Sequence, residues 1–196
     1  MNDLIDANRS LLSQALDLLE AIDDGSYGIA GEACFDTTPG GHMRQILEHY
    51  GNFLHGLGEG LVDYDRRDRG SPVETCRKTA LDLALDLVNG LANVSTESFE
   101  DPLLVIPDDG GSPRQSRSNV ERELQFLLNH TVHHFALVRT ILWIQGQRQF
   151  PENFGIAPST LRYQERIGKQ WVGSCWEGVD WVACHPCSPR STPLGL

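Results

Sequence analysis

The stretch SNVERELQFLLNHTVHHFALVRTILWIQG, residues 118–146, decides the fold of this chain of 196 residues. Apolar side chains recur in it every three or four residues, which is the spacing of one face of an α-helix. Ser118-Asn119-Val120-Glu121 forms a capping box at its start, and Gly146 stands where a helix can end. The pattern predicts one long amphipathic helix.

Three further segments have the same periodicity. They cover about residues 3–23, 39–59 and 72–92. The second opens with Thr38-Pro39, a cap followed by a residue suited to the first helical turn, and the third opens with the capping box Ser71-Pro72-Val73-Glu74. Four amphipathic segments without a strong series of strands predict an all-α fold, a four-helix bundle with long connections of unequal length.

The remaining segments are short or irregular. Residues 103–106 can form an extended piece before a turn-rich run, as part of a small hairpin or a mobile lid. A short helix is expected from Pro158 to near Lys169, and the periodicity is lost beyond it. We therefore expect a bundle domain over 1–167 and an irregular C-terminal tail over 168–196.

The charge balance excludes some partners. The chain has 27 acidic and 16 basic residues, for a formal net charge of -11. Its one arginine cluster, Arg66, Arg67 and Arg69, alternates with aspartates. A chain this acidic repels phosphate groups, so nucleic acid and anionic membranes are not expected as partners.

The sequence also indicates a compartment. No basic segment followed by a long apolar run stands near Met1, and the strongest apolar stretch, 135–144, contains Arg139 and is too short to span a bilayer. Five cysteines are an odd number and do not resemble a secreted disulfide framework. We expect a cytoplasmic protein with reduced thiols.

Two histidines of the longest helix point to a metal. His130 and His134 are four residues apart, so they lie on one face of the helix, among its apolar positions. Buried imidazoles need partners, and a divalent cation satisfies both rings at once. The alternative is one hydrogen-bonded core histidine with the other at the edge of the apolar stripe.

The helix over 39–59 offers a third ligand. His42 and His49 recur near its apolar side. Three neutral histidines from two helices, with the remaining positions left to water or substrate, are typical of a catalytic metal site. His133 is rotated off the ligand face and is expected at the mouth of the site or on the surface.

These histidine segments resemble the DinB-like family. The resemblance rests on Pro39-Gly40-Gly41-His42-Met43-Arg44-Gln45-Ile46-Leu47-Glu48-His49 and on His130-Thr131-Val132-His133-His134, with supporting landmarks at 62–69, 122–124 and 154–163. It spans roughly residues 4 to 166. The resemblance implies a four-helix bundle with a triple-histidine metal site, often a homodimer, related to metal-dependent thiol transferases.

The chain departs from the family pattern at Gln45, where the resemblance places a ligand histidine. We therefore expect the metal ligands to be His42, His130 and His134, with His49 and Gln45 as alternates to His42. A glutamine oxygen binds borderline metals less well than imidazole does. A decayed site that keeps only the bundle is the remaining possibility.

The functional expectation is an enzyme that depends on a divalent metal ion, Zn, Ni, Mn or Fe. It would be a transferase or hydrolase, with thiol-linked reactions included, acting on a small molecule, with the metal as Lewis acid. Glu48 and Glu123 lie close in sequence to the site, but neither is identified as a catalytic base. The alternative is a non-catalytic helical bundle that binds metal or a ligand, with a degenerate site.

A second metal motif stands in the tail. Cys184-His185-Pro186-Cys187 has a spacing that can hold zinc, with Cys175 completing the ligands. The alternative is an irregular appendage whose tryptophans dock on the bundle.

Overall fold

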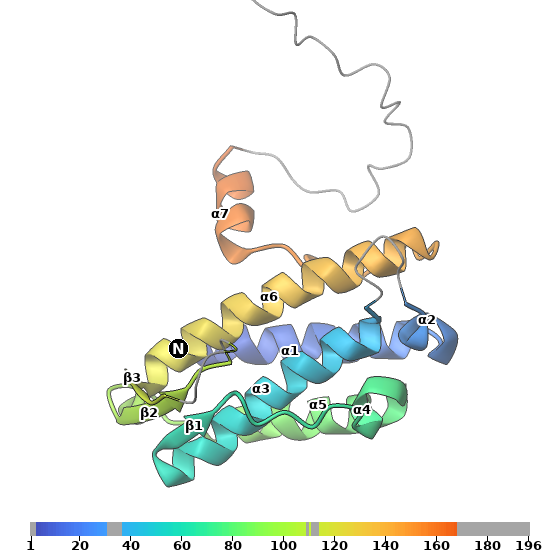
Figure 1. Cartoon of the computed structure of the whole chain (residues 1–196). Helices are drawn as coiled ribbons and strands as arrows, with labels where there is room; N and C mark the ends of the chain where they lie inside the picture. The colour runs from blue at the N-terminus through green and yellow to red at the C-terminus, as the bar shows by residue number, and fades with distance from the viewer. Residues whose placement is uncertain (1–2, 31–36, 109, 111–113, 168–196) are drawn as a thin grey trace, which may run out of the picture.

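Four long helices form the body of the molecule. The structure is a computed structural model and describes residues 3–30, 37–108, 110 and 114–167. They are α1 (Asp3–Ala21), α3 (Pro39–Glu59), α5 (Arg77–Leu91) and α6 (Val120–Ile144). Both α1 and α3 pack on α5 and on α6, so the order around the bundle is α1, α5, α3, α6 (Figure 1). This confirms the predicted all-α four-helix bundle.

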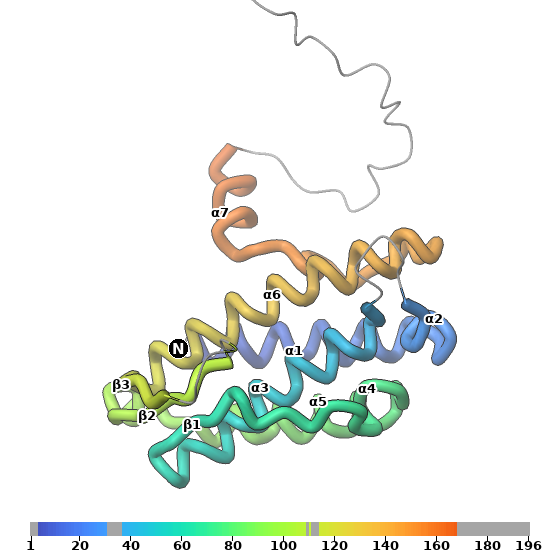
Figure 2. The backbone as a smooth tube through the Cα atoms, viewed as in Figure 1, coloured from blue at the N-terminus to red at the C-terminus, as the bar shows by residue number. Residues whose placement is uncertain are grey.

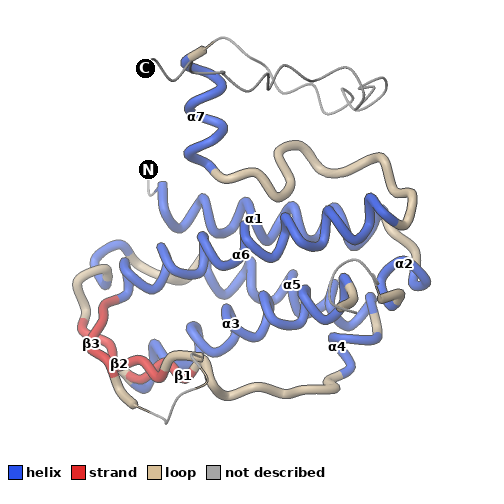
Figure 3. The backbone as a smooth tube through the Cα atoms, turned by 45° about the horizontal axis from the view of Figure 1, so that its top comes forward, coloured by secondary structure: helices blue, strands red, loops and turns tan. Residues whose placement is uncertain are grey.

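A small sheet lies at one end of the bundle (Figure 3). Its strands are β1 (Leu61–Asp63), β2 (Pro102–Ile106) and β3 (Ser116–Asn119). β2 pairs in parallel with β1 and antiparallel with β3. The antiparallel pair confirms the hairpin, whereas β1 was not predicted because three residues are too few to show an alternating pattern.

Four short helical pieces complete the described chain. They are α2 (Asp24–Gly28), α4 (Pro72–Thr75), the 3-10 turn η2 (Thr96–Ser98) and α7 (Pro158–Arg166). The prediction of one helix over 72–92 was wrong in one respect, because Cys76 is extended, with φ -118° and ψ 103°. That residue separates α4 from α5.

The helix caps follow the sequence only in part. The Thr38 hydroxyl accepts a hydrogen bond from the Gly41 N–H at 2.9 Å, which confirms the predicted start of α3. Ser71 makes no such bond. The cap of α6 is Asn119 instead of Ser118, since its side chain accepts from the Arg122 N–H at 2.8 Å. Both capping boxes were therefore wrong in detail, although the helices begin where expected.

The core runs along the inside of all four long helices. Fully buried apolar side chains come from each of them, among them Leu12, Ile46, Phe53, Ala84, Leu124 and Val138. Burial of one large apolar side chain contributes roughly 1.5–3 kcal/mol, so this shared interior is the main source of stability. No helix in the described ranges is long and apolar enough to cross a membrane.

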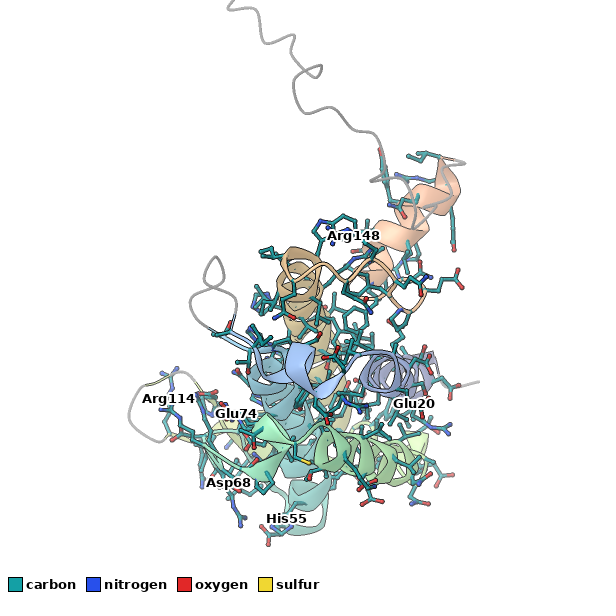
Figure 4. The ribbon with its side chains drawn as sticks, turned by 90° about the vertical axis from the view of Figure 1, so that its right-hand side faces the viewer. Glu20, His55, Asp68, Glu74, Arg114 and Arg148 are labelled. Carbon is teal, nitrogen blue, oxygen red and sulfur yellow. The ribbon has the colours of Figure 1, made fainter. Side chains whose placement is uncertain are left out.

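Two segments, the connection 64–71 and α7, lie on the outside of the bundle. The connection 64–71 runs from the sheet along the outside to α4, as the tube in Figure 2 shows. In Figure 4, Asp68 of this connection lies on the side opposite Arg148, which follows α6. α7 lies outside the bundle and has no buried residue. The predicted tail, with its Cys184–Cys187 motif, lies outside the described residues.

Candidate metal centre

Helices α3 and α6 bring four histidines together. His42 and His49 are two turns apart on α3, and both are buried. His130 and His134 are one turn apart on α6, where His134 is buried and His130 is partly buried. Because α3 packs against α6, all four imidazoles lie at one interface.

The four rings form a continuous row. The centroids of His49 and His130 are 4.1 Å apart with nearly parallel planes. The His130 and His134 centroids are 4.4 Å apart, and those of His134 and His42 are 5.1 Å apart. The structure therefore joins the His130 and His134 pair to both histidines of α3.

At one end of the row, a hydrogen bond shows which nitrogen of His49 carries the proton. The Nδ1 atom of His49 lies 2.8 Å from the Gln45 carbonyl oxygen. A carbonyl only accepts, so the His49 proton is on Nδ1 and its Nε2 carries a free lone pair.

A second chain of contacts occupies the other end. The Nδ1 atoms of His42 and His134 are 2.9 Å apart, and His42 Nε2 is 3.0 Å from the Thr37 hydroxyl. Between two Nδ1 atoms, one must donate and the other accept. His42 and His134 therefore hold a single proton between them at this contact.

His130 has an unsatisfied nitrogen. Its Nε2 atom is buried and has no hydrogen-bond partner in the described part of the chain. Buried polar atoms almost always have a partner, so such an atom requires an explanation. This nitrogen is therefore available to a ligand.

Burial keeps these imidazoles neutral. It lowers the pKa of His49 to about 4, of His134 to about 3 and of His130 to about 2. It also lowers the pKa of His42. The neutral ring is the form that binds a metal, so the row is ready to act as a donor set at pH 7.

The ring nitrogens of the four histidines do not form a converged set of metal ligands. Within the described ranges, no three His, Cys, Asp or Glu side chains are grouped as a metal-ligand cluster. Gln45 contributes its backbone carbonyl to His49, while its side chain lines a neighbouring cavity. His133 is exposed, as the sequence predicted, and meets the His134 ring edge-on at 5.3 Å.

A cavity of about 480 Å³ opens beside His49 and His130. One wall is aromatic and the other comes from the sheet and the start of α6. The remaining lining residues are Gln45, Tyr64, Val105, Pro107, Asp108, Ser116, Arg117, Ser118, Arg122, Glu123 and Phe126. Sequence reasoning missed most of this wall because the sheet that carries it gave no strand signal beyond 103–106.

The two acidic residues near the site have different roles. Glu48 is paired with Arg44 at 2.5 Å and accepts from the Asp68 N–H at 3.1 Å, so it joins α3 to the outer connection. Glu123 is buried in the cavity wall, where its carboxylate accepts from the Ser118 hydroxyl at 2.5 Å. Of these two residues, only Glu123 lines the cavity and would meet a bound molecule.

The fold has a counterpart among solved structures. The crystal structure of a DinB-like protein from Bacillus subtilis matches 78% of this chain and 99% of its own chain, with a TM-score of 0.56 and 15% sequence identity. The chain therefore has a DinB-like fold, in agreement with the resemblance drawn from its histidine segments.

The sequence comparisons are less informative. No protein-family model matches the chain. A region of 106 residues is 31% identical to FK506-binding protein 5 of Rhizopus delemar, which covers 53% of this chain and 27% of that protein. The chain thus spans about a quarter of the length of this curated relative.

Proposed function

We propose that this protein is an enzyme that depends on a divalent metal ion held between α3 and α6, and that it acts on a small molecule in the adjoining cavity. The observation that carries the proposal is the buried His130 Nε2, which lacks a partner within a row of neutral imidazoles. A metal ion would satisfy it together with its neighbours.

The chemistry of the imidazole donors supports such an ion. Imidazole nitrogen is a good ligand for Zn, Ni and Fe, and a poorer one for Mn, which prefers oxygen. Three imidazoles leave positions open for water or substrate, as catalytic sites require. The bound ion would act as a Lewis acid that polarises a substrate or lowers the pKa of a bound water or thiol.

The hydrogen bonds favour His49 over His42 as the ligand from α3. His49 Nε2 has a free lone pair because its proton is on Nδ1. If His42 donates from Nε2 to Thr37, its Nδ1 accepts the His134 Nδ1–H, and His134 Nε2 is free as well. We propose this assignment, with His49, His130 and His134 as ligands.

In this assignment His42 is a positioning residue. Its Nδ1 accepts a hydrogen bond from the His134 Nδ1–H and so fixes the orientation of that ring. The opposite proton assignment leaves His42 Nε2 accepting from Thr37 and puts the His134 proton on Nε2. In that case His42, which the sequence ranked first, would be a ligand in exchange for its bond to Thr37. Metal affinity of the His42 and His49 variants separates the two.

The reaction that best suits the site is group transfer or hydrolysis, including transfer to a thiol. The chain contributes a shielded row of neutral bases and a carboxylate, Glu123, held by Ser118. The proposal extends to a cytoplasmic homodimer, on the basis of the family resemblance and the sequence.

A second candidate is a non-catalytic bundle with a degenerate site. It is favoured by the absence of a converged ligand cluster among the described residues. It is also favoured by Gln45, which stands where the resemblance places an imidazole.

Metal uptake tests the proposal. The full-length protein would be stripped with a chelator, dialysed and titrated with Zn, Ni, Fe and Mn, and its metal content measured by elemental analysis. We expect one ion per chain, with Mn bound most weakly. A protein that takes up none of the four metals would support the degenerate bundle.

A further inference from the structure

The cavity beside His49 and His130 has a wall made of stacked rings. His49 and Tyr64 are stacked at 5.1 Å, Tyr64 and Phe126 are 5.0 Å apart, and Phe126 lies 5.5 Å from His130. Such a wall favours a flat or apolar group, because aromatic faces gain both burial and stacking energy.

The carboxylates in this cavity are already engaged. Asp108 is paired with Arg67, and Glu123 accepts from Ser118. The ion pair neutralises Asp108, whereas Glu123 keeps its negative charge because the Ser118 hydroxyl is neutral. One negative charge therefore remains against the arginines of the same cavity.

Two arginines of the cavity have no such partner. Arg117 on β3 and Arg122 on α6 are exposed and form no ion pair within the described ranges. Arg44, in contrast, is bound by Glu48 and Glu74. In a chain with a net charge of -11, two unpaired guanidinium groups at one cavity mark a local site for an anion.

The Tyr64 hydroxyl is a further donor in the same wall. It is buried beside the Glu123 carboxylate. A hydroxyl in this wall offers a bound ligand a neutral hydrogen-bond donor.

We propose that the cavity binds a small organic acid. Its apolar body lies on the wall formed by Tyr64 and Phe126, and Arg117 and Arg122 bind its anionic group. This inference rests on the proposed function in one point: the end of the acid away from the arginines would be the reacting end, beside His49 and His130.

Two dyes test the inference on the full-length protein in the presence of a chelator. They are 1-anilinonaphthalene-8-sulfonate and N-phenyl-1-naphthylamine, which share an aromatic body but differ in the sulfonate. We expect the sulfonate dye to bind more tightly and to weaken with added salt. In the double variant Arg117→Gln/Arg122→Gln its affinity should fall about tenfold, while that of the neutral dye stays unchanged.

Two controls define the result. Arg162→Gln removes an exposed arginine from α7 and should leave both dyes unaffected. Phe126→Leu should weaken both dyes alike, because it shortens the shared aromatic wall. Circular dichroism verifies that each variant is folded.

Equal affinity for the two dyes, or a double variant that binds both as the wild type does, would overturn the inference. Zinc titration of the same proteins keeps this result apart from the proposed function. Loss of the sulfonate dye in a double variant that still takes up zinc supports both proposals. Arginine-dependent binding by a wild-type protein that takes up no metal supports the cavity inference and rejects the enzyme.

Discussion

A buried polar network fixes three helices against one another at the residue scale. The Tyr50 hydroxyl of α3 donates to Asn8 Oδ1 of α1 at 2.7 Å. Asn8 Nδ2 donates to the Leu124 carbonyl of α6 at 3.1 Å, and the Thr131 hydroxyl lies 3.3 Å from that of Tyr50. Because these groups are buried, they allow only one register of the helices.

Replacing Tyr50 with Phe tests this network. The change keeps the ring but leaves Asn8 Oδ1 buried without its donor, so we expect the free energy of unfolding to fall by about 1–3 kcal/mol. Urea denaturation would measure it. The exposed Tyr163→Phe should change stability by less than about 0.5 kcal/mol. Equal effects would show that the network contributes nothing specific.

The buried histidines predict an acid-sensitive fold. Their pKa values fall from 6.5 to about 4 for His49, 3 for His134 and 2 for His130. Below pH 6.5 the unfolded chain therefore binds more protons than the folded one. With a chelator present, stability should be complete above pH 6.5 and fall as the pH drops towards 4, by up to about 1.4 kcal/mol per pH unit for each histidine.

Thermal melts at several pH values would measure this acid limb. The variant His130→Leu removes one buried imidazole, so its stability should decline less steeply below pH 6.5. An acid limb of unchanged slope in this variant would contradict the assignment of a low pKa to His130.

At the residue scale, the sequence predicted which histidines share a helix face, but it did not predict the contacts around them. His42, His49, His130 and His134 share helix faces, and helical spacing shows that directly. The contacts of His42 with Thr37 and of His49 with Tyr64 depend on loops whose path no periodicity describes.

At the scale of elements, one glycine of α3 lets the chain return to the sheet. A Cβ atom on Gly56 would lie 2.5 Å from the Leu61 carbonyl oxygen and 2.8 Å from the Val62 Cα. Both are backbone atoms of β1, which cannot move aside locally. Gly51, one turn and a half earlier on α3, has open space at the same place.

These two glycines make a matched pair of variants. Gly56→Ala should lower the free energy of unfolding by roughly 1–3 kcal/mol, because the added methyl overpacks the junction of α3 and β1. Gly51→Ala should raise it by roughly 0.5–1 kcal/mol, because alanine is the better helix former. Chemical denaturation of both variants would show opposite signs, and a shared sign would contradict this packing.

The helices were predictable, and their details were less so. The apolar stripes predicted α1, α3 and α6 to within a few residues. The break at Cys76 was hidden because the apolar periodicity of 72–92 continues across it. Glu74 does not complete a capping box, because the Ser71 N–H donates to the Asp68 carbonyl at 3.2 Å. Its carboxylate pairs instead with Arg44 of α3 at 3.1 Å, a contact between segments far apart in sequence.

At the scale of the whole molecule, the bundle and the sheet contribute different parts of the candidate site. The packed pair α3 and α6 holds the imidazoles away from water, and the sheet closes one end to form the cavity. The sequence predicted the first from helical periodicity. It could not predict the second, because the parallel pairing of β1 with β2 joins residues some 40 positions apart along the chain.

The most direct test is the zinc affinity of the full-length protein and of three single variants. We predict that wild type binds one zinc ion and that His130→Ala and His49→Ala abolish binding. His42→Ala should keep it with an affinity lowered by about 10–100-fold, the usual effect of losing a residue that orients a ligand. Binding that survives in His49→Ala but is lost in His42→Ala would contradict the account.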